Sequence, residues 1–272
     1  MVGGRLITIG LLSSIIISAA ILIYVFVVVP LRLSKVTYGV SVETVKGGLV
    51  YLPPPHKVTT VSVEEAILQR RSIRDYTNEP IKLDYLSMIL WAAYGITDPS
   101  WGFRASPSAG ATYPLEIYVV VGKRGVVLSN GSYLEAGVYR YDYNRHVLIL
   151  VKEGEFKEQL YEAALNQRWV LNAPVNIVIC AVYERTTRVY GERGVRYVHM
   201  EVGHVGENIY LMATALGLGT VAVGAFYDDK VAQIIGTGCE APLYIMPIGV
   251  PAEHRKVGFT DIANYIIKAR GG

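Results

Sequence analysis

The chain combines a moderate length with a nearly balanced charge. It has 272 residues, 51% of them hydrophobic, and a formal net charge of +3 from 26 basic and 23 acidic side chains. This length suits one soluble domain with an appendage, because domains commonly run to about 100–200 residues. A charge this close to neutral gives no electrostatic basis for binding DNA or RNA, so we expect no nucleic-acid partner.

The N-terminus carries an uncharged apolar segment, Leu6 to Val29. As a helix rising about 1.5 Å per residue it would reach about 36 Å, which crosses a hydrocarbon core of about 30 Å. A cleaved signal peptide is the alternative, although its apolar region is ordinarily only about 7–15 residues long. We expect residues 1–33 to form a single-pass membrane anchor. Arg5 precedes the segment and Arg32 and Lys35 follow it, so the positive-inside rule leaves the side of the soluble domain open.

A linker or extended arm is expected over residues 34–60, because glycine and proline clusters interrupt this stretch. The compact domain then spans residues 61–272. Its first helix begins after the cap Ser62, has acids in its first turn, and runs to Arg70 or Arg71. Apolar residues on one stripe predict a second helix from Leu83 to Tyr94.

The remainder of the domain alternates strand patterns with helix patterns. Runs dense in β-branched and aromatic residues predict strands, and the uninterrupted apolar run at 175–182 is typical of a strand covered on both faces. Strands separated by helices favour an α+β or α/β sheet domain with helices packed on the sheet. The predicted strands are 115–121, 137–142, 146–151, 175–182, 220–226 and 243–249, and the predicted helices are 156–165, 198–216 and 228–235.

Three arginines and a hydroxyl lie close together where the first predicted helix ends: Arg70, Arg71, Ser72 and Arg74. The fork geometry of arginine suits phosphate, and the hydroxyl adds another donor. A solvated basic helix end is the alternative interpretation, since cations at that position also interact favourably with the helix dipole.

A second candidate is the loop around Pro107, Ser108 and Ala109, which leads into the strand at Leu115. Small side chains let a backbone approach a flat ligand and present its N–H and C=O groups. A third candidate follows the glycines Gly217 and Gly219. It is not a dinucleotide fingerprint, because that motif follows a strand and opens a helix, whereas these glycines end a helix and open a strand.

The stretch 190–204 supplies candidate proton donors. Tyr197, Arg193 and His204 are the residues proposed for catalysis, since each side chain can donate a proton or polarise a water. His199 and His204 do not have the spacing of a helical metal pair, and no third ligand is evident, so no metal is expected.

Taken in order, these motifs resemble the nitroreductase superfamily, and within it the SagB-type dehydrogenases, which include azoline oxidases of peptide natural-product pathways. Together the matching pieces span about residues 62–260. They are Arg-Arg-Ser-Ile-Arg at 70–74, Ser-Pro-Ser-Ala-Gly-Ala-Thr-Tyr-Pro-Leu-Glu at 106–116, Tyr-Gly-Glu-Arg-Gly-Val-Arg-Tyr at 190–197, Glu-Val-Gly-His at 201–204 and Gly-Leu-Gly-Thr at 217–220.

The resemblance implies an α+β, nitroreductase-like fold with a central sheet flanked by helices, and a homodimer with FMN at the subunit interface. It implies that the arginine–serine tract binds the flavin phosphate and ribityl chain, and that the proline–serine loop of the other subunit lies along the isoalloxazine ring. The strand after the glycines then packs over the ring, and a basic residue near the C-terminus helps to hold the phosphate. The implied cofactor-binding residues are Arg70, Arg71, Ser72, Arg74, Pro107, Ser108, Ala109, Val223, Gly224 and Arg255, with Lys256 as the alternative to Arg255.

The function expected from these observations is a membrane-anchored FMN-dependent oxidoreductase. It would transfer hydride or electrons between NAD(P)H, or another donor, and a small-molecule acceptor. Two alternatives remain: a SagB-type dehydrogenase that oxidises peptide azolines to azoles, and a flavin-binding membrane protein without turnover, because binding residues do not prove catalysis.

Overall fold

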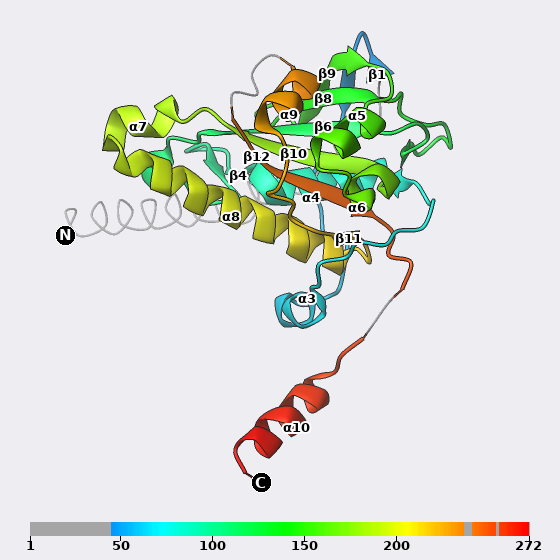
Figure 1. The fold of residues 1–272 in the computed structure, drawn as a ribbon, viewed down its shortest axis with the longest axis vertical. Coiled ribbons are helices and arrows are strands. Elements are labelled where there is room, and N and C mark those ends of the chain that lie inside the picture. The colour runs from blue at the N-terminus through cyan, green and yellow to red at the C-terminus, as the bar shows by residue number, and fades with distance from the viewer. Residues whose placement is uncertain (1–44, 237–240, 254–255, 272) are drawn as a thin grey trace, which may run out of the picture. The chain divides into compact units, whose positions relative to one another are not determined.

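The centre of the protein is an eight-stranded antiparallel sheet (Figure 1). The structure is a computed structural model that describes residues 45–236, 241–253 and 256–271. The strands follow the order β1-β2-β9-β8-β6-β10-β12-β11. Their bounds are β1 Val45–Lys46, β2 Leu49–Tyr51, β6 Leu115–Val121, β8 Gly137–Asp142, β9 Val147–Glu153, β10 Val175–Ala181, β11 Gly219–Thr220 and β12 Ala241–Gly249.

The two central strands, β6 and β10, are buried along their whole length. Ile177 on β10 pairs with Val119 on β6, and both side chains enter one core cluster, whereas Val178 and Tyr118 enter the other. Because successive side chains of a strand point to opposite faces, each face of the sheet is apolar and must be covered. The uninterrupted apolar pattern of these strands is thereby explained.

Helices cover both faces of the sheet. The core cluster on one face includes residues of α4 (Leu83–Tyr94) and α8 (Arg193–Ala215), and the cluster on the other face includes residues of α5 (Lys157–Ala163), α6 (Arg168–Asn172) and α9 (Asp228–Ile235). The predicted bounds of α4 and α9 are confirmed. The long helix α8 begins five residues before the predicted start at Val198. A Cβ on Gly194 would lie 2.8 Å from the Thr187 Cα, so this glycine allows α7 (Glu184–Tyr190) to pack tightly on the first turn of α8.

Part of the predicted arm lies on the domain. β2 pairs with β9, and the Ser87 hydroxyl of α4 donates to the Pro53 carbonyl at 2.6 Å. The predicted membrane anchor, residues 1–33, lies outside the described residues. Within the described ranges, no helix has both the length and the apolar character that a membrane crossing requires.

One predicted strand is much shorter in the structure. Of the stretch 220–226, only Thr220 belongs to β11, and Val223 makes an isolated bridge to Ile245 of β12. Between them, the Ala222 N–H donates to the Tyr210 hydroxyl of α8 at 2.8 Å instead of to a neighbouring strand. The pairing with β12 is therefore interrupted between Thr220 and Val223, where a side chain accepts the backbone N–H.

The other elements are short or peripheral. α3 (Val63–Gln69) has the predicted cap, because the Ser62 side chain accepts from the Glu65 N–H and the Glu65 carboxylate accepts from the Ser62 N–H. Two small ladders pair β3 (Ile81–Lys82) with β7 (Val126–Val127) and β4 (Ile96–Asp98) with β5 (Phe103–Arg104). Residues 259–269 form α10 (Phe259–Ala269), all of whose side chains are exposed.

The half-buried His146 side chain makes the stability of the fold depend on pH. Its ring lies 2.7 Å from the Ser87 hydroxyl, 2.8 Å from the Tyr141 hydroxyl and 3.0 Å from the Pro53 carbonyl. Burial lowers the pKa of His146 below its ordinary value of about 6.5, although the Pro53 carbonyl opposes this. The unfolded chain then binds the proton more readily, so His146 contributes its full stability above about pH 6.5 and loses it as pH falls through the folded-state pKa.

We expect the free energy of unfolding to fall more steeply from pH 7 to pH 5 in the wild type than in His146→Asn. Asparagine is the chosen replacement because it tolerates the positive φ of 50° at this position. Each unit of pKa depression contributes about 1.4 kcal/mol to the difference. Urea unfolding at several pH values measures it, and parallel pH profiles for the two proteins would contradict the prediction.

Candidate functional site

The hydroxyl group of Tyr210, on α8, joins two segments that are far apart in the sequence. It lies 3.0 Å from the Ser72 hydroxyl and accepts the Ala222 N–H at 2.8 Å. The Arg70 guanidinium carbon lies 5.2 Å from the centroid of the Tyr210 ring, within the range of a cation–π contact. The arginine–serine tract and the start of the 222–224 segment therefore meet at one side chain.

The backbone from Ser72 to Tyr76 reaches this place because two glycines leave room for it. The Ile73 N–H donates to the Thr220 carbonyl at 2.9 Å, which aligns the tract with β11. A Cβ on Gly219 would lie 2.7 Å from the Ile73 Cβ, and one on Gly249 would lie 2.8 Å from the Tyr76 ring. Side chains larger than hydrogen would push the tract away from the sheet edge.

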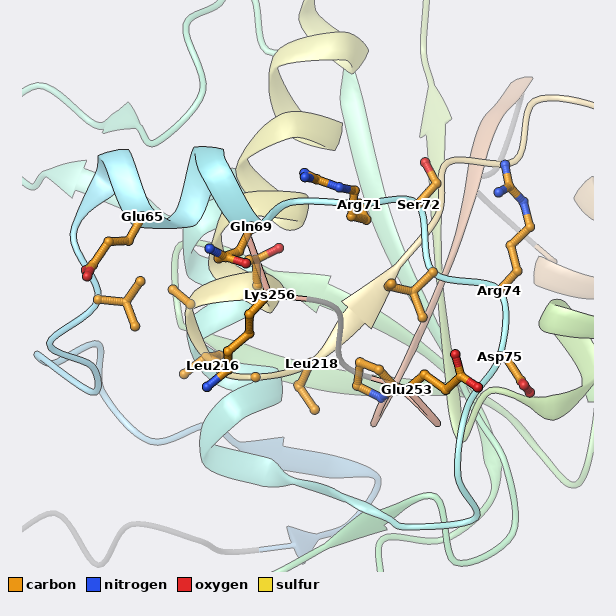
Figure 2. A pocket seen from close by; sticks show the side chains of 16 residues that line it. Glu65, Gln69, Arg71, Ser72, Arg74, Asp75, Leu216, Leu218, Glu253 and Lys256 are labelled. Carbon is orange, nitrogen blue, oxygen red and sulfur yellow. The ribbon is translucent and has the colours of Figure 1, made fainter. Parts of the chain in front are cut away.

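An extended backbone sends alternate side chains to the same side. Figure 2 shows the Ser72 hydroxyl and the Arg74 guanidinium pointing to the same side of the chain. Both residues are exposed, and the Arg74 guanidinium also lies 5.5 Å from the Trp169 ring centroid. Cationic and hydroxyl donors are thus available to an anion on the side where Tyr210 lies.

The segment that meets the arginine–serine tract at Tyr210 continues into Val223 and Gly224, which have small side chains or none. Val223 is buried and Gly224 is exposed. A Cβ on Gly206 of α8 would lie 3.3 Å from the Tyr244 ring, and one on Gly224 would lie 3.8 Å from it. The Thr220 hydroxyl is buried and has no hydrogen-bond partner among the described residues. Exposed donors beside a glycine-lined backbone fit a phosphorylated planar ligand such as FMN.

A pocket of about 910 Å³ adjoins the tract, and Ser72 and Arg74 are among the side chains that line it (Figure 2). Lys256 and Arg71 line this pocket, but so do three carboxylates, Glu65, Asp75 and Glu253. Three negative charges disfavour a dianionic phosphate close to these carboxylates. Arg255, the predicted C-terminal phosphate ligand, lies outside the described residues.

The proline–serine loop lies against α7 and against α8 near Glu201, and not near Tyr210. Gly110 adopts a φ of 59° within the short 3-10 turn Ala109–Ala111, and a Cβ there would lie 2.5 Å from the Tyr190 hydroxyl. Ser108 is hydrogen-bonded to Glu201 of α8. At about 1.5 Å per residue, Glu201 lies roughly 14 Å along the helix from Tyr210. One chain therefore does not bring Pro107, Ser108 and Ala109 to the arginine tract.

The predicted catalytic residues lie on the outward side of α8. With 3.6 residues per turn, Arg193, Tyr197 and His204 are roughly 100–140° around the helix from Tyr210, away from the core-facing Ile209. Arg193 and His204 are exposed, and the Tyr197 ring packs edge-on against Tyr190 at 5.1 Å between centroids. Within one chain these three residues do not reach the Tyr210 site, so their catalytic role stays a prediction.

Sequence reasoning missed Tyr210. A signal was present, because Gly203, Gly206 and Tyr210 follow each other at helical spacing on one face of α8. Two glycines followed by a tyrosine leave open space on that face with one hydroxyl at its end. Pattern alone did not distinguish this face from an ordinary close helix contact.

Comparison with known proteins places the chain. Residues 67–250 match the model of the Nitroreductase family. The chain belongs to the nitroreductase family. It is 52% identical over 192 residues to a Methanocaldococcus jannaschii protein named as a nitroreductase, covering 71% of this chain and 92% of that protein.

Two more distant family relatives have informative names. The chain is 26% identical over 210 residues to the FMN reductase [NAD(P)H] of Bacillus subtilis, which covers 70% of this chain and 66% of that enzyme. It is 26% identical over 169 residues to the microcin B17-processing protein McbC of Escherichia coli, which covers 60% of each protein. The chain spans a little more than half of the latter's length.

Solved structures share the fold. A nitroreductase of Ralstonia eutropha is similar with a TM-score of 0.65 and 25% identity, covering 78% of this chain and 95% of that one. The predicted α+β, nitroreductase-like fold, with a central sheet flanked by helices, is therefore confirmed for the described residues.

Replacing Tyr210 by phenylalanine is expected to weaken flavin binding. The substitution removes the hydroxyl that links Ser72 to Ala222 at the site, and leaving the part-buried Ala222 N–H without its acceptor costs about 1–3 kcal/mol. Affinity for FMN should fall by about 5- to 150-fold, as measured by quenching of flavin fluorescence. Tyr227→Phe, which removes an exposed hydroxyl, is the control, and equal affinities for the two variants would contradict the prediction.

Proposed function

We propose that this chain is an FMN-dependent oxidoreductase that transfers hydride or electrons between a donor such as NAD(P)H and a small-molecule acceptor. The observation that carries the proposal is the meeting of Arg70, Ser72 and Ala222 at Tyr210. Membership of the nitroreductase family and the likeness to a flavin reductase support the same cofactor and donor.

In this proposal the protein binds and orients the cofactor, and FMN supplies the hydride chemistry. Arg70, Ser72 and Arg74 hold the phosphate and ribityl chain with charge-assisted hydrogen bonds. Gly224 and its neighbour Val223 bring bare backbone against the ring, and the Val223 side chain packs in the core cluster beneath and fixes that backbone. Arg71 lies on the same tract, where its side chain donates to the Leu68 and Arg70 carbonyls, and its predicted part in binding the phosphate stays a prediction.

A homodimer completes the proposed site. Ser108 contacts α8 at Glu201, roughly 14 Å along the helix from Tyr210, so Pro107, Ser108 and Ala109 would serve the flavin of a second copy. The exposed helix α10 supports such a dimer, because Phe259, Ile262, Tyr265, Ile266 and Ile267 are all exposed. An isolated helix this short is marginal in water, so its apolar side chains favour burial against another chain. Tyr197, Arg193 or His204 would then donate protons to a substrate at the interface.

Membrane attachment is proposed from the sequence alone. The apolar segment 6–29 is long enough to span a bilayer, and a membrane-bound flavoprotein would have access to quinone-like acceptors.

A second candidate function is oxidation of peptide azolines to azoles. It is favoured by the likeness to the microcin B17-processing protein McbC and to the trifolitoxin operon protein TfxC of Rhizobium leguminosarum. A solved complex of McbB, McbC and McbD with a bound precursor peptide shares the fold at a TM-score of 0.59. The azoline hypothesis requires partners comparable to those of that complex. Genes for a cyclodehydratase beside this one would support it.

The spectrum of the purified full-length protein tests the proposal. We expect a yellow protein with about one FMN per chain, whose flavin absorbance bleaches when NADH or NADPH is mixed in a stopped-flow instrument. A colourless protein that takes up no added FMN would overturn the proposal. Bound flavin that neither NADH nor NADPH reduces, and that gives no turnover with dithionite as the electron source, would instead support flavin binding without catalysis.

A further inference from the structure

A carboxylic acid is buried beneath the proline–serine loop. Glu201 projects from α8 and its exposed fraction is only 2%. The Tyr94 hydroxyl donates to its Oε1 at 2.5 Å, and the Ser108 hydroxyl also donates to the carboxyl group. Burying an acid costs several kcal/mol unless it is well hydrogen-bonded, so its partners indicate what it holds in place.

Both partners of Glu201 are themselves fixed to the backbone. The Tyr94 side chain is fully buried at the end of α4, and its oxygen accepts the Leu115 N–H at 3.3 Å. The Ser108 oxygen accepts the Tyr113 N–H at 2.9 Å. One carboxyl group therefore connects α8 to the end of α4, to the first residue of β6 and to the loop that carries Pro107 and Ala109.

Besides Tyr94, the charged or titratable groups that act on Glu201 come from two elements, β5 and α8. Arg104 of β5 has its guanidinium carbon 4.4 Å from the Tyr94 ring centroid, 4.0 Å from that of Tyr113 and 3.4 Å from that of Tyr143. His204 faces the carboxyl from the next turn of α8. Burial is the largest influence and raises the pKa of Glu201, which favours the neutral acid, while Arg104 and His204 oppose it.

The middle of the loop has few polar side chains of its own. Ala109, Gly110 and Ala111 offer no polar side chains, and Pro107 is exposed. Ser106 is anchored below them, because its hydroxyl donates to the Ala93 carbonyl at 2.8 Å. Thr112 holds the far end of the loop, because its hydroxyl donates to the Ala109 carbonyl at 3.0 Å and lies 2.7 Å from the Thr186 hydroxyl. Between these two anchors, the Ser108–Glu201 contact links the middle of the loop to α8.

We propose that Glu201 is the positioning residue of the Pro107–Ala109 loop, acting through Ser108 and Tyr94. The inference rests on the proposed function for its consequence, since that loop is the part proposed to lie along the flavin ring of a second copy. Hydrogen bonding, and not charge, carries the effect, so glutamine replaces Glu201 with little loss and leucine does not.

The first test measures the loop without reference to flavin. Amide hydrogen–deuterium exchange of residues 107–112 is compared in the full-length wild type, Glu201→Leu, Glu201→Gln, Ser108→Ala and the Glu201→Leu/Ser108→Ala double variant. We expect exchange about tenfold faster in each of Glu201→Leu and Ser108→Ala, no further increase in the double variant, and wild-type exchange in Glu201→Gln.

Glu207→Leu is the matched control, because Glu207 is an exposed acid on the same helix. Peptides from β10 report whether a variant has loosened the whole fold. If Glu201→Leu also speeds exchange in β10, its result is set aside, and the loop exchange of Ser108→Ala and Glu201→Gln decides the test. Unchanged loop exchange in Ser108→Ala, fully additive effects in the double variant, or fast exchange in Glu201→Gln would overturn the proposal.

The second test adds FMN. We expect the dissociation constant for FMN to rise about tenfold in Glu201→Leu and in Ser108→Ala, and to stay at the wild-type value in Glu201→Gln. Wild-type protein that binds no FMN would contradict the proposed function. The exchange experiment would still test whether Glu201 positions the loop. Wild-type FMN binding with no change in either variant would instead contradict the role of Glu201 at the flavin.

Discussion

Replacing both Arg70 and Arg74 by alanine is expected to release FMN from the protein. A hydrogen bond to a charged group contributes about 1.5–3 kcal/mol, so losing one from each arginine weakens binding by about 3–6 kcal/mol. That corresponds to roughly 10²- to 10⁴-fold in the dissociation constant. The Arg70 guanidinium lies beside Tyr210, and Arg74 points to the same side as Ser72. Flavin absorbance after dialysis, followed by fluorescence titration with added FMN, measures the loss.

The double substitution of Arg145 and Arg188 by alanine is the matched control. Both arginines are exposed and lie away from the 70–74 tract in the sequence, and the net charge changes by the same amount. The control should retain its flavin. A stoichiometric flavin in the Arg70/Arg74 variant would show that these two arginines do not hold the phosphate, and Arg71 and Lys256 would become the next candidates.

Introducing acids on the apolar face of α10 is expected to convert a dimer into monomers. Ile262 and Ile266 lie one turn apart on the helix and are both exposed in the single chain. Burying two such side chains against a partner contributes about 3–6 kcal/mol, and a buried unpaired aspartate adds a further cost. We therefore expect Ile262→Asp/Ile266→Asp to weaken association by at least about 100-fold, as measured by light scattering after gel filtration.

The polar face of the same helix provides the control. Thr260→Ala/Asn264→Ala changes two residues at the same spacing and leaves every apolar side chain in place. That variant should stay dimeric. In the proposed function the monomeric variant also loses FMN, because the loop of the second copy no longer covers the ring. A dimer that persists in the aspartate variant would mean that α10 does not contribute to the interface.

Short-range sequence patterns correctly predicted the helices and strands that depend mainly on neighbouring residues. The helix at Leu83–Tyr94 follows its apolar stripe, and the strand at Leu115–Val121 follows its run of β-branched residues. The stretch 220–226 satisfies the same strand pattern, yet only Thr220 belongs to a strand and Val223 makes an isolated bridge. Between them the Ala222 N–H donates to Tyr210, which comes from a helix earlier in the chain. The alternation of side chains along a strand carries no information about a hydrogen-bond partner that comes from a distant helix.

Some residues of the candidate site could be predicted from the sequence, and others could not. Arg70, Ser72 and Arg74 were recognisable because their chemistry is unusual for so short a stretch, and the structure gathers Arg70 and Ser72 at one hydroxyl. Tyr210 and Glu201 were not recognisable as partners, because a tyrosine and a glutamate inside a long helix resemble ordinary surface residues. Only the packing of α8 against α4 and the sheet decides which helical positions are buried.

The lengths of the outermost strands bear on how copies of this protein meet. In the described part of the chain, the sheet ends in β1 and β11, each of two residues. Such short margins offer few unpaired backbone groups, so they are poor templates for the strand-to-strand joining that leads to open-ended aggregation. Association between copies is thereby left to helical surfaces, where side chains set the number of partners and permit a closed pair.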